Sequence, residues 1–399
     1  MALAYSVLGK NRRGLASCLL FSALWCLSEY FRSTLMGGFP WLLVGTGQMD
    51  TPLKHMLPIF GVYGVSFLTC FAATSLVMFI QTVSVKRYIW IMVFVGILLT
   101  PLLLKDKVWV NISPTPLSSG IIQANLSMRD KWDETLFWQL INLYKNSIDQ
   151  LLAKKKKLII LPESAIPISA HYISDFLETI DIQAKQANSA ILMGIIQDTS
   201  PDETSYYNAL KGLGNANGLY NKQHLVPFGE FTPRPFEQIL QWLSFPMSTM
   251  ISGHNHQALI RIDNHPIASL ICYELAFPSL VRKQLPEAEL IVSVSDDGWF
   301  GHSLAMYQQL QIAQALAKQT ARYHVTVNND GLSSFIDTQG NIVSSLPTFT
   351  SGLLEDDIYS ATGSTPWVMM GDMPILLVCV LIVLMGIFSE SKHLILKGW

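Results

Sequence analysis

The segment Leu158-Ile-Ile-Leu-Pro-Glu-Ser-Ala165 decides the fold of the middle of this chain. Four apolar residues in a row are typical of a short strand that is buried on both faces. Pro162 ends the strand because proline cannot donate to a sheet ladder. Glu163 then lies at the carboxyl end of the strand, the edge where α/β folds place their sites. The segment therefore predicts a buried strand that presents a functional carboxylate.

Further segments on both sides of this strand extend the pattern. Short apolar runs predict buried strands at 120–123, 157–161, 190–196, 268–271, 290–294 and 324–328. Apolar residues at helical spacing predict helices at 132–152, 175–186 and 303–322. A second group of strands, at 206–212, 259–262 and 333–343, has the pattern of hairpins. Strands that alternate with helices are typical of an α/β domain.

Charge divides the 399 residues into two unlike parts. Residues 107–372 hold 17 of the 27 Lys and Arg and 25 of the 29 Asp and Glu, which gives a net charge of −8. The remaining residues hold 10 basic and 4 acidic side chains, a net charge of +6. The whole chain, at −2, has no basic field for a nucleic-acid partner, so we expect none.

Long apolar runs lie only outside the charged part. The runs at 14–31, 55–80, 88–104 and 373–389 contain a single charged residue, Glu29. A bilayer core needs about 20 apolar residues, so we predict four transmembrane helices and treat Glu29 as a candidate for function or helix pairing. The predicted organisation is a membrane region at 1–106 with about three helices, an extramembrane domain at 107–372, and a final helix and tail at 373–399.

Basic residues near the predicted spans set their direction. If there are four spans, Arg13, the pair Lys86 and Arg87, and the tail lysines Lys392 and Lys397 fall on one side. The positive-inside rule places that side in the cytoplasm. We therefore expect a multi-pass protein of the bacterial inner membrane, with its large domain in the periplasm.

Cys272 is the candidate nucleophile. Of the five cysteines, the other four lie in predicted spans, so the large domain has one thiol and no internal disulfide. A nucleophilic thiol needs a base, a positive charge nearby and a donor for the oxyanion. Glu163 can be the base and Lys222 can supply charge and donor, while His224 or His302 could form a Cys–His dyad instead. This chemistry needs neither a metal nor a cofactor, and we expect neither.

Several motifs together resemble the apolipoprotein N-acyltransferases, the membrane-anchored members of the nitrilase superfamily. The resemblance runs from about residue 20 to the C-terminus, and the segment around Lys222 is the most specific. The matching motifs are Leu-Ser-Glu-Tyr-Phe-Arg at 27–32, Gly-Gly-Phe-Pro-Trp at 37–41, Lys-Trp-Asp-Glu at 131–134, Leu-Pro-Glu-Ser-Ala-Ile-Pro at 161–167, Tyr-Asn-Lys-Gln-His-Leu-Val-Pro-Phe-Gly-Glu-Phe at 220–231, Ile-Cys-Tyr-Glu at 271–274 and Asp-Gly-Trp-Phe-Gly at 297–301.

The resemblance implies a fold, a triad and a reaction. The fold is a nitrilase-like α/β/β/α sandwich flanked by transmembrane helices. Glu163 is then the general base, Lys222 stabilises the tetrahedral intermediate, and Cys272 takes an acyl chain from a phospholipid as a thioester. The α-amino group of a diacylglyceryl-cysteine lipoprotein receives that chain. Supporting positions are Glu230, Glu274, Tyr273 and Trp132.

The sequence departs from the family pattern in a few places. It is shorter at the N-terminus, by about four spans, so we expect an N-terminally short version. Asp296 replaces an asparagine, Gln319 a glutamate, and the segment from Thr326 to Gly331 differs, with Asp330 in it. Two alternatives therefore stay open: a membrane-tethered C–N hydrolase that uses the same triad, and a divergent paralogue with weak or no activity.

Overall fold

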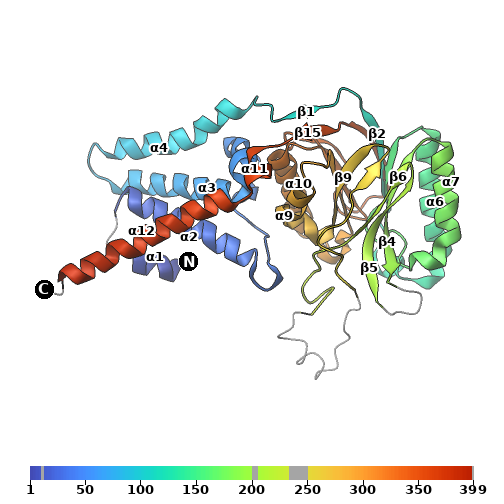
Figure 1. Cartoon of the computed structure of the whole chain (residues 1–399), viewed down its shortest axis with the longest axis horizontal. Coiled ribbons are helices and arrows are strands. Elements are labelled where there is room, and N and C mark those ends of the chain that lie inside the picture. The colour runs from blue at the N-terminus through green and yellow to red at the C-terminus, as the bar shows by residue number, and fades with distance from the viewer. Residues whose placement is uncertain (10–12, 200–204, 233–249, 398–399) are drawn as a thin grey trace, which may run out of the picture. The chain divides into compact units, whose positions relative to one another are not determined.

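The computed structural model describes the chain except residues 10–12, 200–204, 233–249 and 398–399 (Figure 1). The chain forms two compact units. The first consists of Met1–Trp109, Lys318–Thr320 and Ser364–Trp399, and the second of Val110–Ala317 and Ala321–Gly363. The functional division predicted at residues 107 and 372 stays a prediction.

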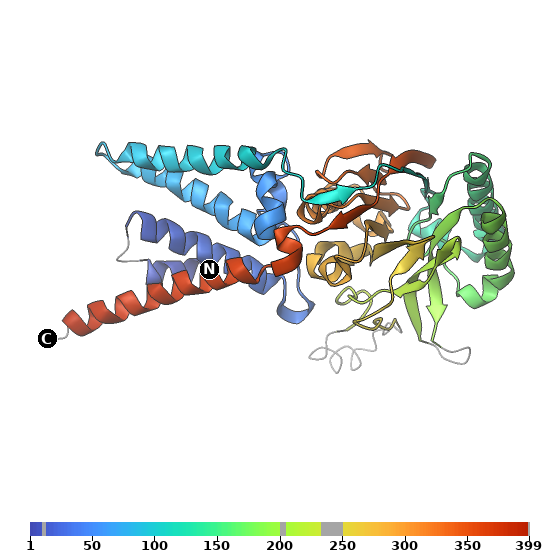
Figure 2. The same ribbon diagram turned by 45° about the horizontal axis from the view of Figure 1, so that its top comes forward.

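Two mixed sheets form the centre of the second unit (Figures 1 and 2). Within the described ranges, one sheet has six strands in the order β14 (Gly352–Ile358), β2 (Leu117–Gln123), β3 (Leu158–Ile160), β4 (Ala190–Asp198), β5 (Tyr206–Gly214) and β7 (Leu219–Asn221). The other has seven, in the order β13 (Ile342–Ser345), β12 (Ser334–Ile336), β11 (His324–Asn328), β10 (Leu290–Ser295), β9 (His265–Ile271), β8 (Ile260–Ile262) and β6 (Ala216–Asn217). Strands β2, β3 and β4 run parallel, as do β9, β10 and β11. A separate pair joins β1 (Val110–Ile112) and β15 (Ala361–Gly363).

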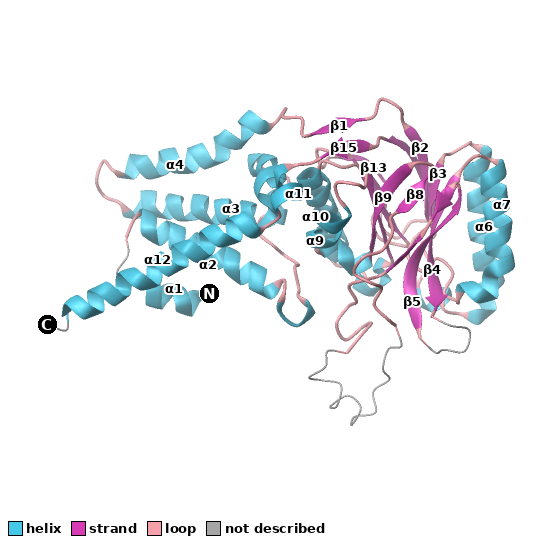
Figure 3. Ribbon diagram, in the orientation of Figure 1, coloured by secondary structure: helices cyan, strands magenta, loops and turns pink. Residues whose placement is uncertain are grey.

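Helices cover the outer faces of both sheets (Figure 3). Helices α6 (Phe137–Ala153) and α7 (Ser174–Gln186) lie on the six-stranded sheet. Helices α9 (Pro278–Gln284) and α10 (Ala305–Thr320) lie on the seven-stranded sheet. A strand covered by helices on one face and by the other sheet on the opposite face must be apolar on both. Strand β3 is an example: Leu158 and Ile160 pack between the sheets, and Ile159 packs under α6 and α7. The predicted α/β/β/α sandwich is confirmed.

Most predicted elements of this unit are present, and one boundary was wrong. All six predicted buried strands form, and 333–343 is the hairpin of β12 and β13. The helix predicted from residue 132 begins at Phe137 instead. Asp133 caps a separate turn, because its carboxylate accepts the backbone N–H of Thr135 at 2.9 Å. The pairing of β14 with β2 was not predicted, since its partner is more than 200 residues away in the sequence.

The first unit is helical. Its helices are α1 (Ala2–Leu8), α2 (Leu15–Arg32), α3 (Leu57–Gln81), α4 (Arg87–Leu99), α11 (Pro366–Met370) and α12 (Met373–Lys397). In the described part, two helical segments are long and apolar enough to cross a membrane: Pro52–Gln81 and Arg87–Leu104. The apolar part of α12, Met373–Phe388, is shorter, and α2 carries Glu29 and Arg32 near its end. The four-span topology therefore stays a prediction.

Glu29 has a structural contact inside this unit. Its side chain is buried, and one carboxylate oxygen accepts from the Trp25 indole N–H at 3.1 Å and from the Val44 backbone N–H at 2.9 Å. The carboxylate therefore ties the segment that follows α2 back to the helix.

Candidate active site

Each residue of the predicted triad lies at the end of a strand. Glu163 follows β3, Lys222 directly follows β7, and Cys272 directly follows β9. Lys222 Nζ lies 3.5 Å from Glu163 Oε1, and both of these charges act on the pKa of the Cys272 thiol. The two sheets therefore bring together three residues that are 59 and 50 positions apart in the sequence.

Cys272 has an unusual backbone conformation. Its φ is 54°, in the left-handed region that non-glycine residues rarely adopt and that is concentrated at functional sites. It is the first residue of the short turn Cys272–Ala276, and it is half-buried. The sharp turn ends β9 and presents the thiol at the edge of the sheet.

Lys222 is completely buried and lies between two carboxylates. Its Nζ donates to Glu230 Oε1 at 2.6 Å in addition to facing Glu163. Its backbone N–H donates to the carbonyl of Asn208 at 2.8 Å, which fixes the main chain. Burial alone would lower the pKa of Lys222, but the carboxylates of Glu163 and Glu230 outweigh it and raise the pKa. The ammonium therefore stays charged at neutral pH.

Glu163 is held by one donor from strand β5 and one from the residue that follows β10. Oε1 accepts from Asn208 Nδ2 at 2.6 Å, and Oε2 accepts from the backbone N–H of Asp296 at 2.9 Å. Burial raises the pKa of Glu163, and Glu230 and Asp296 add to the rise while Lys222 opposes it. A raised pKa brings this carboxylate closer to the working pH, where a general base is most effective.

The pKa of the Cys272 thiol is raised well above its usual value. Burial is the largest cause, and the negative charge of Glu163 adds to it, while Lys222 opposes both. The thiol therefore stays protonated at rest. It needs a base at the moment of attack, and Glu163 is the carboxylate that acts most strongly on it.

Glu274 connects the Cys272 turn to the Lys222 segment. It is completely buried and accepts the Tyr220 hydroxyl at 3.0 Å and the backbone N–H groups of Gln223 at 2.6 Å, His224 at 3.0 Å and Ile271 at 2.8 Å. Burial raises its pKa to about 7, against these backbone hydrogen bonds. Its contacts make it a positioning residue for the two segments.

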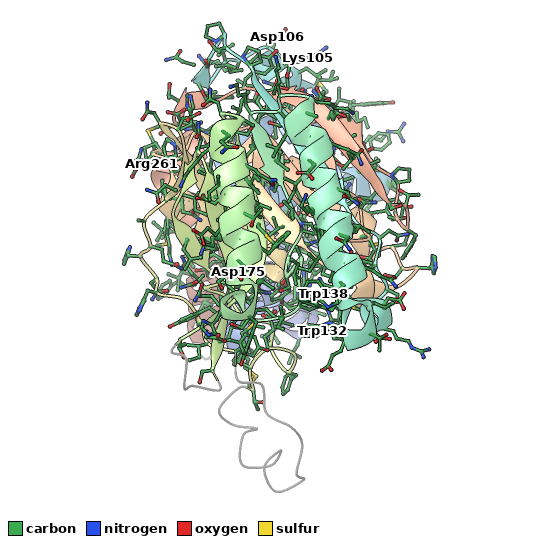
Figure 4. The ribbon with its side chains drawn as sticks, turned by 90° about the vertical axis from the view of Figure 1, so that its right-hand side faces the viewer. Lys105, Asp106, Trp132, Trp138, Asp175 and Arg261 are labelled. Carbon is green, nitrogen blue, oxygen red and sulfur yellow. The ribbon has the colours of Figure 1, made fainter. Side chains whose placement is uncertain are left out.

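The other predicted positions lie around this cluster. Glu230 binds Lys222 and also accepts the backbone N–H of Val226 at 2.9 Å, which orders its loop. The Tyr273 ring meets Phe277 edge to face. Trp132 is 54% exposed and lies near the start of α6 (Figure 4). Trp132 is therefore not part of the buried network around Lys222, and its role stays a prediction.

The two histidines of the alternative dyad pack against aromatic rings. The His224 ring lies 3.8 Å from the Phe277 ring, and the His302 ring lies 4.1 Å from the Phe349 ring, measured between centroids. The short ion-pair distances instead join Lys222 to Glu163 and Glu230. The geometry therefore favours the Glu–Lys–Cys arrangement.

Three residues near Glu163 were not predicted. Asn208 sits inside a strand, Lys131 has no local pattern that signals burial, and Gly194 carries no side chain. A Cβ at Gly194 would lie 2.3 Å from the Pro162 carbonyl oxygen and 2.7 Å from Glu163 Cα. Only glycine lets the Glu163 segment cross β4 this closely. No local sequence signal identifies any of the three.

The departures from the family pattern differ in their surroundings. Asp296 and Asp330 are both buried, and Asp296 binds Glu163 through its backbone N–H. Burial together with Asp296 raises the pKa of Asp330 to about 6. Thr326 lines a small internal cavity beside Ser295 and Gln309. Within the described ranges, no group of three or more His, Cys, Asp or Glu side chains is placed to hold a metal ion.

Two protein families match different parts of this chain. A family model for carbon-nitrogen hydrolases matches residues 120–366, and one for the N-terminal domain of apolipoprotein N-acyltransferase matches residues 1–75. A carbon-nitrogen hydrolase of known structure from Helicobacter pylori G27 aligns with 65% of this chain and 95% of its own at a TM-score of 0.48 and 14% identity, a likeness that adds nothing to the assignment.

Two relatives that match over most of this chain show which family it belongs to. The apolipoprotein N-acyltransferase of Coxiella burnetii (strain RSA 493 / Nine Mile phase I) is 33% identical over 380 residues, which cover 94% of this chain and 78% of that protein. The one from Pseudomonas syringae pv. tomato (strain ATCC BAA-871 / DC3000) is 32% identical over 383 residues, 94% and 75% of the two chains. The predicted resemblance is confirmed: this chain belongs to the apolipoprotein N-acyltransferase family and is an acyltransferase of the nitrilase superfamily.

Proposed function

We propose that the protein transfers an acyl chain from a membrane phospholipid to the α-amino group of a diacylglyceryl-cysteine lipoprotein, through a thioester on Cys272. The observation that carries the mechanism is the buried Lys222, which lies 3.5 Å from Glu163 at the point where the strand of Cys272 ends. This arrangement supplies a base, a nucleophile and an oxyanion donor at one place.

The first half-reaction forms the thioester. Glu163 takes the proton of the Cys272 thiol as the sulfur attacks the ester carbonyl carbon of the phospholipid. The carbonyl oxygen becomes an oxyanion, and the Lys222 ammonium stabilises it. When the C–O bond of the ester breaks, the leaving alkoxide takes the proton from Glu163 and departs as a lysophospholipid.

The second half-reaction transfers the chain. The neutral α-amine of the acceptor attacks the thioester carbon, and Glu163 takes a proton from the nitrogen. The intermediate then breaks its C–S bond, an amide remains on the acceptor, and the sulfur regains a proton from Glu163. Lys222 keeps its charge throughout, because its pKa is raised by the surrounding anions.

We also propose where this takes place. The basic residues beside the predicted spans favour a multi-pass protein of the bacterial inner membrane with its catalytic domain in the periplasm. Both proposed substrates are anchored in the bilayer, so flanking helices would hold the thiol near its surface.

Complementation of a strain depleted of its own N-acyltransferase tests the proposal. We expect the wild-type chain to restore triacylated lipoproteins, seen by mass spectrometry of their N-terminal peptides, and Cys272→Ala to leave them diacylated. Cys70→Ala, which changes another buried thiol, is the matched control and should behave like wild type.

The product separates the alternatives. Free fatty acid without N-acylated lipoprotein would show that water resolves the acyl-enzyme and would favour a membrane-tethered C–N hydrolase. Transfer by a folded Cys272→Ala variant would contradict the mechanism, and diacylated lipoprotein with wild type would indicate a divergent paralogue.

A further inference from the structure

A second buried lysine, Lys131, contacts the main chain of the proposed base, Glu163. Lys131 ends the short helix α5 (Met128–Lys131) and is only 3% exposed. Its Nζ donates to the backbone carbonyl of Glu163 at 3.0 Å and forms an ion pair with Asp296. Burying an ammonium is costly unless it is paired and hydrogen-bonded, and here both conditions are met.

Asp296 completes a closed set of contacts with the same glutamate. Its backbone N–H donates to Glu163 Oε2 at 2.9 Å, and its own carboxylate accepts from Lys131 and from Asn329 Nδ2 at 3.2 Å. Glu163 is therefore fixed at two groups, its main-chain carbonyl and its carboxylate. Lys131 binds its main chain, and Asp296, which Lys131 fixes, binds its carboxylate.

We propose that Lys131 and Asp296 act as a positioning pair for Glu163. They fix the direction in which the carboxylate faces Lys222 and Cys272, and Lys131 neutralises the anion that Asp296 places beside the base. This inference rests on Glu163 acting as the base proposed above.

The charges of the pair have opposite effects on Glu163, which provides a test. Without Lys131, the negative charge of Asp296 acts on Glu163 uncompensated and disfavours its ionised form. Without the Asp296 charge, Lys131 stabilises the ionised form instead. The other groups that face Glu163 or Asp296 stay unchanged in both cases: Lys222, Glu230, Cys272, Asp297, Asp330, Asn208, Asn329 and Tyr144.

The experiment uses alkylation of Cys272 by iodoacetamide in the full chain in detergent, followed through the mass of the Cys272 peptide. The readout needs neither lipid nor lipoprotein. We expect the pH midpoint of the alkylation rate to move up in Lys131→Met and down in Asp296→Asn. The double variant should return close to the wild-type midpoint.

Rates should change as well. Lys131→Met should slow alkylation at neutral pH by about tenfold or more, because a misplaced base loses part of the 10²–10⁴-fold that such catalysis contributes. Asp296→Asn keeps the backbone N–H and nearly the same shape, so it stays informative if Lys131→Met does not fold. The matched control is the exposed pair Lys145 and Asp149, whose variants Lys145→Met and Asp149→Asn should change neither midpoint nor rate.

The outcomes distinguish this inference from the proposed function. If Glu163→Gln does not slow alkylation, the proposed triad fails. If Glu163→Gln slows it but both single variants keep the wild-type midpoint, or move it in the same direction, the positioning pair alone is wrong.

Discussion

Cys272 keeps its proton at rest, because burial and the nearby Glu163 both disfavour the thiolate. This differs from thiol enzymes in which a cation lowers the pKa of the cysteine before substrate arrives. Here Lys222 is shared with Glu163 and Glu230 and cannot offset both burial and the anions. Attack by Cys272 therefore depends on how well Glu163 is positioned to accept the proton.

Asn208→Ala tests how the surroundings of Glu163 set its ability to accept the proton. Asn208 donates to the ionised form of Glu163 at 2.6 Å, so its loss should raise the pKa of Glu163 further. A hydrogen bond to a charged group contributes about 1.5–3 kcal/mol, so the acid limb of kcat/KM should move up by about 1–2 pH units. Asn341→Ala, at an exposed turn, is the control. An acid limb that stays in place or moves down would contradict the assignment of Glu163 as base.

Glu274 should make stability depend on pH. Its folded pKa of about 7 lies above its ordinary value of 4.5, so the folded state binds the proton more tightly. The stabilisation is complete below about pH 4.5 and is lost as the pH rises to about 7, a difference of about 3 kcal/mol. In Tm measurements, Glu274→Gln should therefore destabilise the protein more at pH 5 than at pH 8.

A surface glutamate provides the control for Glu274. Glu355 pairs with Lys154 and Lys156, which lower its pKa, so Glu355→Gln should not reproduce this pH dependence. A Glu274→Gln effect that is equal at both pH values, or larger at pH 8, would show that burial does not set the ionisation of Glu274.

At the scale of elements, the site depends on segments that end at one edge and are linked by backbone contacts. Glu274 joins the Cys272 turn to the segment after β7, and Gly194 in β4 lets the Glu163 segment pass close to the strand. The positive φ of Ser164 (44°), next to Glu163, is part of the same tight passage. The geometry of the triad is thus set by the turns that follow β3, β7 and β9, and not by the strands alone.

Gly194→Ala should displace Glu163. The added Cβ would lie 2.3 Å from the Pro162 carbonyl oxygen, so the backbone must move. We expect a loss of about 1–3 kcal/mol in stability, as for other overpacked positions, and a clear fall in kcat. Gly96→Ala, where no atom lies within 4 Å of the added Cβ, is the control. Wild-type kcat in Gly194→Ala would show that the exact path of this segment does not matter.

The sequence predicted the elements that local patterns describe. Short apolar runs such as Leu158–Ile160 predict strands that are buried on both faces, because strands of this length have no polar face to give to water. The same reasoning cannot find that Lys131 and Lys222 are buried, since a lysine signals the surface unless its partners are known. Those partners, Asp296 and Glu163, are 165 and 59 residues away. Lys222 was identified as a candidate from the needs of a nucleophilic thiol and then from the family resemblance. Lys131 was noted only as part of the motif at 131–134, with no role, and Asn208 was not identified.

At the scale of the whole molecule, the charge of −2 combines a basic, apolar part and an acidic catalytic part. The catalytic unit is a nitrilase-type sandwich, and the other unit contains two helical segments that are long and apolar enough to span a bilayer. An acyltransferase that acts on the two bilayer-anchored substrates proposed above would need such a combination.

The proposed topology can be tested with cysteines introduced at exposed positions. Arg261→Cys lies in the catalytic unit, and Lys86→Cys lies between α3 and α4. In intact cells with a permeabilised outer membrane, a thiol reagent that cannot cross the inner membrane should label Arg261→Cys and not Lys86→Cys. Lysed cells should show labelling of both. The reverse pattern in intact cells would contradict a periplasmic catalytic domain.

The most direct test of the central claim is the mass of the Cys272 peptide after the purified full chain is incubated with phospholipid alone. We expect a mass increase equal to one acyl chain, which hydroxylamine removes. The increase should also disappear when a diacylglyceryl lipopeptide with a free α-amine is added, as the N-acylated lipopeptide forms. A Cys272 peptide that stays unmodified while N-acylated product accumulates would contradict the thioester mechanism.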